Sequence, residues 1–173
     1  EVILDTPAGL VTARATCSNG RCVGVSLDMV PSFVEALDVI IETEEFGPIK
    51  ADIAFDGVYY ALVDVDQICL TIEPNNARKL ADFGVAIRNQ VNRQFKVQHP
   101  LLPEVDKVAY TTFRNRENHP LYQTCTTLPL GRVDRSPCGT GSSANLASLA
   151  ARGIVVDGSQ LFSQSITASE FTI

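Results

Sequence analysis

The stretch from Ser142 to Arg152 constrains the fold more than any other, because it has the pattern of a helix with almost no polar face. Its apolar positions are Ala144, Leu146, Ala147, Leu149, Ala150 and Ala151. A helix that is apolar on most sides is buried, and small alanine side chains allow strands to approach it closely from several sides. Gly153 follows as the residue that ends the helix in a left-handed conformation.

Most of the remaining chain has the alternation and the turn signals of β-strands. We predict strands at Val2–Leu4, Leu10–Thr16, Cys22–Leu27, Val34–Thr43, Ile49–Phe55, Val58–Val65, Val105–Phe113, Leu121–Thr127, Ile154–Val156 and Gln160–Phe171. Hairpin turns are predicted at Asn19-Gly20 and Asp56-Gly57. A second, amphipathic helix is predicted over Asn76–Arg93, and the segment Arg114–Asn118 is a predicted polar loop. Residues 1–173 are therefore expected to form a single α+β domain whose sheet wraps the buried helix.

Size and charge exclude several classes of protein. The 173 residues suffice for one domain or two small ones, and a content of 45% apolar and 20% charged residues is ordinary for a globular protein. A net charge of −6 gives no attraction to nucleic acid or to an anionic membrane surface. No apolar run in the sequence is long enough to span a bilayer.

The five cysteines of the chain are scattered. An odd and scattered set is not typical of a secreted disulfide framework, so we expect a reducing, cytoplasmic setting. Cys17 and Cys22 flank a predicted turn, where they could pair or form half of a metal site. Two ordinary strand residues are the favoured interpretation, and no metal site is predicted. Cys69 and Cys125 are interpreted as small core residues.

The segment Asp134–Ala144, with the sequence D-R-S-P-C-G-T-G-S-S-A, carries the clearest chemical signal. It places Cys138 in a glycine-bearing turn just before the buried helix, which Ser142 or Ser143 could cap. The start of a helix offers unpaired N–H groups and a partial positive charge, and these favour a bound carboxylate or the thiolate of the cysteine. The segment therefore predicts a site where a cysteine handles a small carboxylic acid.

Spacing excludes several other loops that bind phosphate or carry a catalytic thiol. A P-loop has Lys after its last glycine, where this chain has Ser142. A phosphatase-type thiol loop has Arg six residues after its cysteine, where this chain has Ala144. A papain-like pairing would need His99 or His119, which we interpret as surface residues, and its local signature around the thiol is absent.

The residues around the thiol divide the expected chemistry between them. The N–H groups of Gly139 and Thr140 can hold a carboxylate, which places the substrate α-carbon within reach of Cys138 as a base. Asp134 can accept a hydrogen bond from an ammonium or ring N–H of the same substrate. This arrangement suits proton abstraction next to a carboxylate. The alternative is a tight turn with a buried thiol, which we would prefer for one cysteine beside one glycine but not for the whole segment.

This segment closely resembles the second catalytic motif of the proline racemase family, which includes 4-hydroxyproline epimerases and trans-3-hydroxyproline dehydratases. The resemblance covers most of the chain. It extends to Asp5–Gly9, Val30–Phe33, Tyr60–Asp64, Ala151–Gly153, Ser165-Ile166 and Ser169–Phe171.

The resemblance implies a fold of two similar domains, each a β-barrel-like mixed sheet around a central helix, as in diaminopimelate epimerase. It also implies chemistry without a cofactor, in which two cysteines face each other across the α-carbon of proline or hydroxyproline. One cysteine removes the proton and the other returns one to the opposite face. By this resemblance Cys138 is one of the pair, Gly139 and Thr140 bind the carboxylate through backbone N–H groups, and Asp134 contacts the ring nitrogen.

The chain also departs from the family pattern. The first motif, of the M-x-C-G-H type, is absent, so we expect approximately the second domain, shortened at both ends and inactive without the first. The chain starts at Glu1 and stops within the strand-like Phe171–Ile173. The usual Gly-Gly of one hairpin is Asp56-Gly57 here, and Ser142 replaces a usual Thr. Homodimers are common in this family, so a homodimer is a possible assembly.

The leading hypothesis is an amino-acid racemase or epimerase that acts on proline or hydroxyproline. A trans-3-hydroxyproline dehydratase of the same family is the second hypothesis, and a non-catalytic carboxylate-binding relative is the third. A thiol at position 138 favours the first, because the resemblance implies that dehydratases tend to lack a cysteine there. Elimination of water needs only one essential base.

Overall fold

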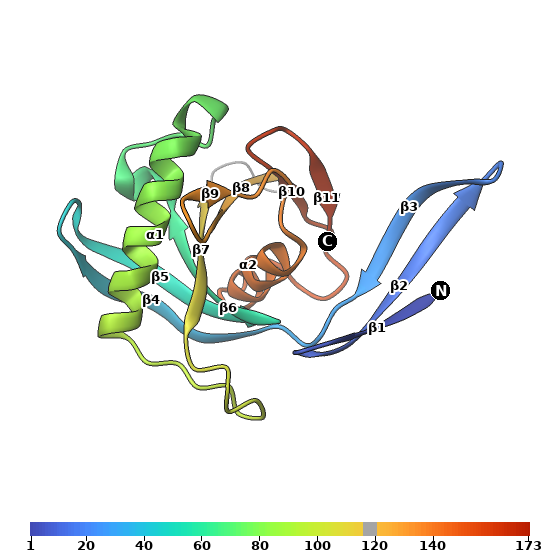
Figure 1. Ribbon diagram of the computed structural model, residues 1–173, viewed down its shortest axis with the longest axis horizontal. Coiled ribbons are helices and arrows are strands. Elements are labelled where there is room, and N and C mark those ends of the chain that lie inside the picture. The colour runs from blue at the N-terminus through green and yellow to red at the C-terminus, as the bar shows by residue number, and fades with distance from the viewer. Residues whose placement is uncertain (116–120) are drawn as a thin grey trace.

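A computed structural model describes residues 1–115 and 121–173, and its most prominent feature is an arm that stands away from the body (Figure 1). The arm is an antiparallel sheet of three strands in the order β1-β2-β3. Its strands are β1 (Val2–Thr6), β2 (Gly9–Ser18) and β3 (Arg21–Asp28). The three strands predicted for this part of the chain are confirmed, as is the turn at Asn19-Gly20, where both residues have positive φ.

The body is built on a mixed sheet in the order β11-β10-β8-β7-β6-β5-β4, with β9 paired to β8. Its strands are β4 (Phe33–Thr43), β5 (Gly47–Asp56), β6 (Val58–Asp64), β7 (Val108–Asn115), β8 (Leu121–Leu128), β9 (Arg132–Val133), β10 (Phe162–Gln164) and β11 (Glu170–Thr172). The β6–β7 and β8–β10 pairs are parallel, and the other pairs are antiparallel.

Helix α1 (Ala77–Gln94) covers one face of this sheet, as predicted for Asn76–Arg93 (Figure 1). Two short 3-10 turns, η1 (Val65–Ile68) and η2 (Pro74–Asn76), lead into it. Its buried positions are Leu80, Ala81, Gly84, Ile87 and Val91. Several of these pack against strand residues such as Ile53 and Phe113, so the main hydrophobic core lies between α1 and the sheet.

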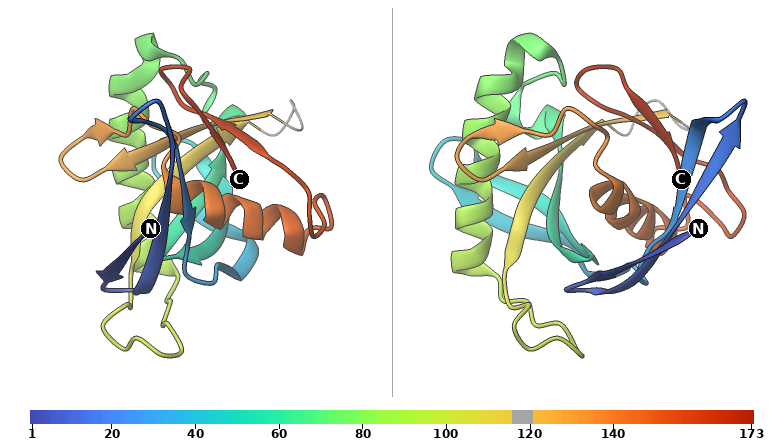
Figure 2. Two further views of the ribbon diagram at one scale, coloured as in Figure 1. Left: turned by 90° about the vertical axis from the view of Figure 1, so that its right-hand side faces the viewer. Right: turned by 45° about the vertical axis from the view of Figure 1, so that its right-hand side comes forward.

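Helix α2 (Gly139–Ala151) lies on the other face of the sheet, against β4, β5 and β6 (Figure 2). It begins at Gly139 rather than at the predicted Ser142. It ends as predicted, because Gly153 has a φ of 69° and the N–H of Ile154 bonds the carbonyl of Leu149. Its buried face includes Asn145 and Ser148, so the helix is less uniformly apolar in its contacts than in its sequence.

A buried polar network fixes α2 to the sheet. The guanidinium of Arg114, in β7, donates to Asp52 in β5 at 2.6 Å, to Asn145 at 2.9 Å and to Ser148 at 3.0 Å. Asp52 also accepts from Arg152, just after the end of α2. Arg114 and Asp52 are each 2% exposed, so the centre of the network is shielded from water. It holds the helix axis relative to β5 and β7 through charge and geometry as well as through apolar packing.

Several expectations need correction. The sheet bends around α2 but stays open, because β4 and β11 are unpaired at its two ends in the described part of the chain, so no closed barrel is seen. Ile154–Val156 is a turn region and not a strand. Gln160–Phe171 contains two short strands with a turn between them. Arg114 belongs to a strand and not to a loop, and residues 116–118 of that predicted loop lie outside the described residues.

The cysteines and histidines fall into different surroundings. Cys125 is buried as predicted, whereas Cys69 is exposed at the end of η1 and is not a core residue. Cys17 and Cys22 are free, exposed thiols opposite each other in the β2–β3 ladder, in line with two ordinary strand residues. The ring of His99 packs against two phenylalanines and is only partly exposed. His119 lies outside the described residues.

No helix in the described ranges is long and apolar enough to cross a membrane.

We expect Gly84→Ala to destabilise the protein. A Cβ atom at Gly84 would lie 2.2–2.6 Å from side-chain atoms of Thr127 in β8, including its Cβ, so α1 would have to move off the sheet. This crowding should lower the free energy of unfolding by roughly 1–3 kcal/mol, in spite of the higher helix propensity of alanine. Urea denaturation measures the change. Gly24→Ala in β3 is the control, because nothing lies within 4 Å of its Cβ position; equal stability of the two variants would contradict the close approach.

We expect Asp52→Asn to lower the free energy of unfolding at pH 7 by roughly 3–5 kcal/mol, because it removes the buried carboxylate that pairs with both Arg114 and Arg152 and leaves Arg114 with Asp64 alone as its anion among the described residues. Burial alone would raise the pKa of Asp52, but the hydrogen bond from Arg152 and the charge of Arg114 lower it below its ordinary value. A carboxyl group with a lowered pKa stabilises the fold above its unfolded pKa, near 4, and loses that effect as the pH falls. Denaturant titrations at pH 7 and at about pH 2 should therefore show a smaller difference between the two proteins at the lower pH.

The control for this variant is Asp82→Asn, which breaks the exposed ion pair with Arg78 on α1. An exposed pair of this kind contributes about 0.3–0.5 kcal/mol. A similar small loss from Asp52→Asn would show that the buried network does not hold α2.

Candidate functional site

Cys138 caps the N-terminus of α2 and sits on a sharply turned backbone. Its φ is 63°, which is uncommon for a non-glycine residue. Its carbonyl accepts the first intrahelical hydrogen bond, from Ser142 N–H at 2.8 Å. Its half-buried sulfur lies 3.8 Å from the hydroxyl of Tyr60 and 3.9 Å from that of Thr140. The sulfur is thus placed at the start of the helix, as the sequence predicts.

Three backbone N–H groups lie directly after the thiol. Because Ser142 donates the first bond of the helix, the N–H groups of Gly139, Thr140 and Gly141 have no partner inside it. They occupy the positive end of the helix dipole, where an anion is favoured. Gly139 is exposed, so a ligand can reach this end of α2.

Gly141 packs closely against the sulfur. A Cβ atom at this residue would lie 3.1 Å from Cys138 Sγ and 3.1 Å from Thr126 Oγ1 of β8. A larger residue would therefore require the thiol or the side chain of Thr126 to shift by a few tenths of an ångström. Gly139 has nothing within 4 Å of its Cβ position. The absence of a side chain there leaves the start of the helix open to a ligand and is not needed for close packing.

The serines predicted as helix caps have other partners. Ser142 Oγ donates to the carbonyl of Pro137 at 2.9 Å, and Ser143 Oγ donates to the carbonyl of Gly139 at 3.2 Å. Neither side chain caps the helix, because the helix starts earlier than predicted. The first-turn N–H groups therefore stay available to a ligand.

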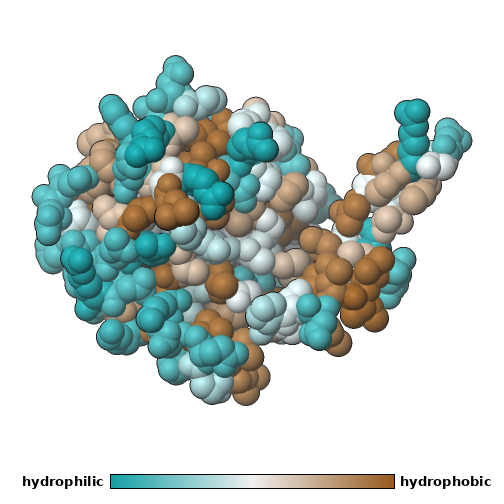
Figure 3. Space-filling model, viewed as in Figure 1, coloured by the Kyte–Doolittle hydropathy of each residue, from teal (hydrophilic) through white to brown (hydrophobic). Residues whose placement is uncertain are grey.

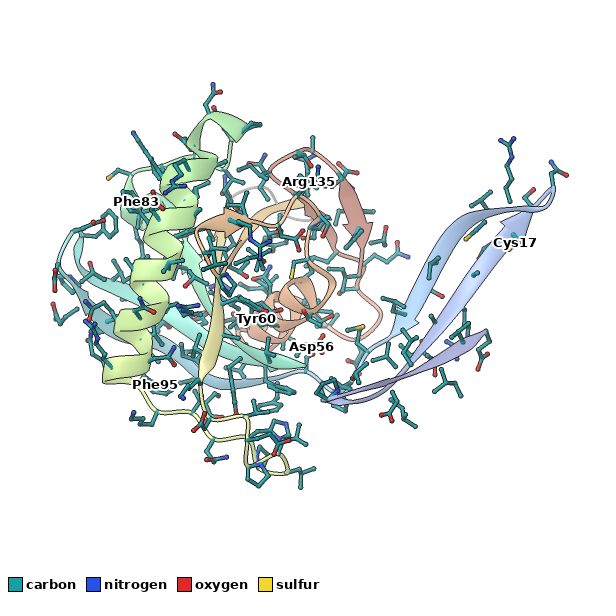
Figure 4. The ribbon with its side chains drawn as sticks, viewed as in Figure 1. Cys17, Asp56, Tyr60, Phe83, Phe95 and Arg135 are labelled. Carbon is teal, nitrogen blue, oxygen red and sulfur yellow. The ribbon has the colours of Figure 1, made fainter. Side chains whose placement is uncertain are left out.

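Asp134 shapes the turn that presents the thiol. Its Oδ1 accepts hydrogen bonds from the N–H of Ser136 at 2.8 Å and from the hydroxyl of Ser136 at 2.9 Å. The same hydroxyl accepts from the N–H of Cys138 at 3.2 Å. Asp134 borders a hollow that it shares with Arg135, which Figure 4 labels, and with Thr167. The structure thus gives Asp134 a local role, and its contact with a substrate stays a prediction.

A second hollow, of about 330 Å³, lies between the base of the arm and the body. Apolar residues gather there, as Figure 3 shows where the arm meets the body. Its lining is Thr6, Pro7, Ala8, Val11, Met29, Val30, Asp56, Gly57, Val58, Tyr60, Tyr110 and Thr140. This volume suits a small ligand. The structure therefore places Thr140 in one hollow and Asp134 in the other, with Cys138 in the segment that links them.

Tyr60 joins the sheet to the thiol turn. It lies in β6 and its hydroxyl is hydrogen-bonded to Thr140 Oγ1 at 2.5 Å, next to the sulfur of Cys138. Burial raises the pKa of Tyr60 well above its ordinary value, so it contributes a neutral hydroxyl. The sequence analysis did not identify this residue as part of the site, because it lies far from the motif along the chain.

Asp56 is the second residue that sequence reasoning missed. It ends β5 and its side chain is 0% exposed, yet neither carboxylate oxygen has a hydrogen-bond partner among the described residues. Burial raises its pKa to about 6. Ser143 opposes the shift from nearby, although its hydroxyl donates to the Gly139 carbonyl and makes no well-formed bond to the carboxylate. The only signal in the sequence was the departure from a Gly-Gly turn.

Comparison with known proteins shows the family to which the chain is similar. The chain matches the family described as "Proline racemase" over residues 1–173. It is 52% identical over 172 residues to a 4-hydroxyproline 2-epimerase of Allorhizobium ampelinum and 54% identical to one of Agrobacterium fabrum; each match covers 99% of this chain and 50% of the relative. It is 34% identical to a proline racemase of Clostridioides difficile, over 98% of this chain and 51% of that protein.

Solved structures show the same similarity. A hydroxyproline epimerase from Agrobacterium vitis, with bound trans-4-hydroxy-L-proline, superposes with a TM-score of 0.94 and is 53% identical, covering 99% of this chain and 49% of that one. The chain thus spans about half the length of the relatives it matches.

We expect Asp56 to make the stability of the protein depend on pH. Its pKa is higher in the folded state, near 6, than in the unfolded state, near 4, so ionisation favours unfolding and the penalty grows as the pH rises between these values. Asp56→Asn removes this titration. The variant should gain stability relative to the parent protein by up to about 2 kcal/mol on going from pH 4 to pH 7.5. Thermal unfolding across this range measures the gain, and the exposed Asp157→Asn serves as control; a constant difference between variant and parent would contradict the shifted pKa.

Proposed function

The chain belongs to the proline racemase family, and we propose that the protein containing it is a hydroxyproline 2-epimerase. In this proposal the chain is approximately the second domain and supplies one of two cysteines that move a proton at the substrate α-carbon, without a cofactor. The observation that carries the proposal is the position of Cys138, whose sulfur lies at the N-terminus of α2 beside three backbone N–H groups without helical partners. The high identity to 4-hydroxyproline 2-epimerases supports hydroxyproline as the substrate.

The N-terminus of α2 would bind the substrate carboxylate. The N–H groups of Gly139 and Thr140 would donate to it, and the partial positive charge of the helix would attract it. When the α-proton leaves, negative charge develops next to the carboxylate. The same fixed donors then stabilise that charge, since they are already oriented and need no rearrangement.

Cys138 would act as base or acid on one face of the α-carbon. Its sulfur is held by the turned backbone, by the close approach of Gly141 and by the neighbouring hydroxyls of Tyr60 and Thr140. The second cysteine would come from the other half of the protein and would face the opposite side of the α-carbon. Asp134 would accept a hydrogen bond from the N–H of the substrate ring. Its Oδ2 would be the acceptor, because Oδ1 already accepts the hydrogen bonds of the turn.

The other half of the protein would also complete the fold. The resemblance implies two similar domains with the substrate between them, and the site of this chain faces outward at Gly139, where such a domain could cover it. A covered site excludes water and strengthens the electrostatic effect of the helix. The same covering would complete the barrel-like enclosure of α2 that the described strands leave open.

The reaction is tested with the full-length protein and three substrates in D₂O: trans-4-hydroxy-L-proline, L-proline and trans-3-hydroxy-L-proline. We expect inversion of 4-hydroxyproline at the α-carbon with uptake of deuterium, followed by polarimetry and NMR. Formation of a Δ1-pyrroline product from the 3-hydroxy substrate alone would show a dehydratase instead. Binding without turnover of any of the three would show a carboxylate-binding relative.

We expect Cys138→Ser to lower kcat for epimerisation by about 10²- to 10⁴-fold, because a hydroxyl is a far weaker base than a thiol at neutral pH. Cys69→Ser is the matched control, since its thiol is exposed and belongs to neither hollow. Full activity of the Cys138 variant, or an equal loss in the control, would remove Cys138 from the reaction.

A further inference from the structure

Asp56 is a buried carboxylate whose surroundings do not satisfy it. Asp52, four residues earlier on the same strand, is buried to a similar degree but accepts hydrogen bonds from Arg114, Arg152 and Ser148. Asp56 accepts none from the described residues. Leaving a buried carboxylate without a partner opposes folding, so a residue of this kind at a turn needs an explanation beyond the fold itself.

The position of Asp56 points to the hollow beside the thiol turn. It lines this hollow together with Tyr60 and Thr140 (Figure 4 labels Asp56 and Tyr60). The adjacent turn residue packs directly on the helix, because a Cβ at Gly57 would lie 3.5 Å from the methyl group of Thr140. The turn that follows Asp56 therefore packs against the first turn of α2.

The lining of the hollow offers Asp56 no cation. Its other members are apolar residues, a glycine, two tyrosines and two threonines, and the hydroxyls of Tyr60 and Thr140 are bonded to each other. A full partner for Asp56 has to come from outside the described residues, and a ligand in this hollow can bring one. The ligand has to carry a hydrogen-bond donor and enough apolar surface to fit the remaining walls of the hollow.

We propose that Asp56 accepts a hydrogen bond from the ring hydroxyl of bound hydroxyproline and so favours this amino acid over proline. The inference rests on the proposed function. The substrate carboxylate cannot face Asp56, because like charges repel. The ring nitrogen is assigned to Asp134, which lines another hollow that the thiol turn also borders. The hydroxyl is the donor that remains, and the ring methylenes fit the apolar lining.

This arrangement explains how the protein could distinguish two amino acids that differ by one oxygen atom. A buried acceptor that stays unpaired when proline binds weakens that complex, whereas hydroxyproline pairs it. A purely apolar hollow could not make this distinction, because it would admit both rings. Asp56 is therefore assigned as a residue that determines specificity and not as a base.

The test measures equilibrium binding to the full-length protein that carries Cys138→Ser, so that bound substrate is not consumed. Calorimetry gives the Kd of trans-4-hydroxy-L-proline and of L-proline, with and without a second substitution. Asp56→Ala should raise the Kd for 4-hydroxyproline at least about tenfold more than the Kd for proline. Asp56→Asn keeps the shape and a neutral acceptor, so it should recover part of this loss.

The control is Val58→Ala, which lines the same hollow and removes only apolar surface. It should weaken the binding of both amino acids by the same factor. Equal effects of Asp56→Ala on the two ligands, or no effect on either, would overturn the role of Asp56. In that case turnover of 4-hydroxyproline by the unsubstituted protein would leave the proposed function intact. If the unsubstituted protein neither bound nor converted 4-hydroxyproline, the proposed function would fail, and this inference with it.

Discussion

The ion pairs between Arg114, Asp52 and Arg152 are the interaction on which the site depends. Apolar packing alone holds a helix loosely in rotation, because alanine side chains fit a sheet in several orientations. The guanidinium of Arg114 bonds one acceptor in β5 and two in α2, which selects one orientation. That orientation turns the N-terminus of α2, with Cys138, toward the base of the arm. A buried ion pair need not add net stability, but in this fold it specifies geometry.

The sequence predicted those elements whose signal is local. The apolar pattern of α2, the amphipathic pattern of α1 and the hairpin turns each depend on residues near in sequence. The start of α2 was placed too late, because Gly139, Thr140 and Gly141 have low helix propensity and the thiol turn, not a serine, precedes the helix. Arg114 was assigned to a loop because of its polar neighbours. Its partners lie 31 to 62 positions away, so only the folded chain shows that it is buried.

The residues of the candidate site also differ in whether nearby sequence could predict them. The relation of Cys138 to Gly139 and Thr140 is fixed within one turn of backbone, so the motif alone predicted it. Tyr60 is separated from Thr140 by 80 positions and reaches the thiol only because β6 runs beside α2. Asp134 was predicted as a ligand contact, whereas the structure shows that it also builds the turn through Ser136. A carboxylate in a tight turn can serve both purposes, since it has two oxygens and the turn uses Oδ1.

Strand β5 carries two buried aspartates, of which one has charged partners and the other has none in the described part of the chain. The paired aspartate lies at the end of α2 that is fixed to the sheet, and the unpaired one lies at the end that carries the candidate site. Asp52 lies near the C-terminal end of the helix, where Arg152 and Arg114 neutralise it. Asp56 lies near the N-terminal end, where the helix dipole favours an anion but no residue in the described part of the chain pairs with it. A fold selected for stability alone would place a glycine or an apolar residue there. An unpaired carboxylate at the open end of the helix is therefore best explained by a ligand that brings its own donor.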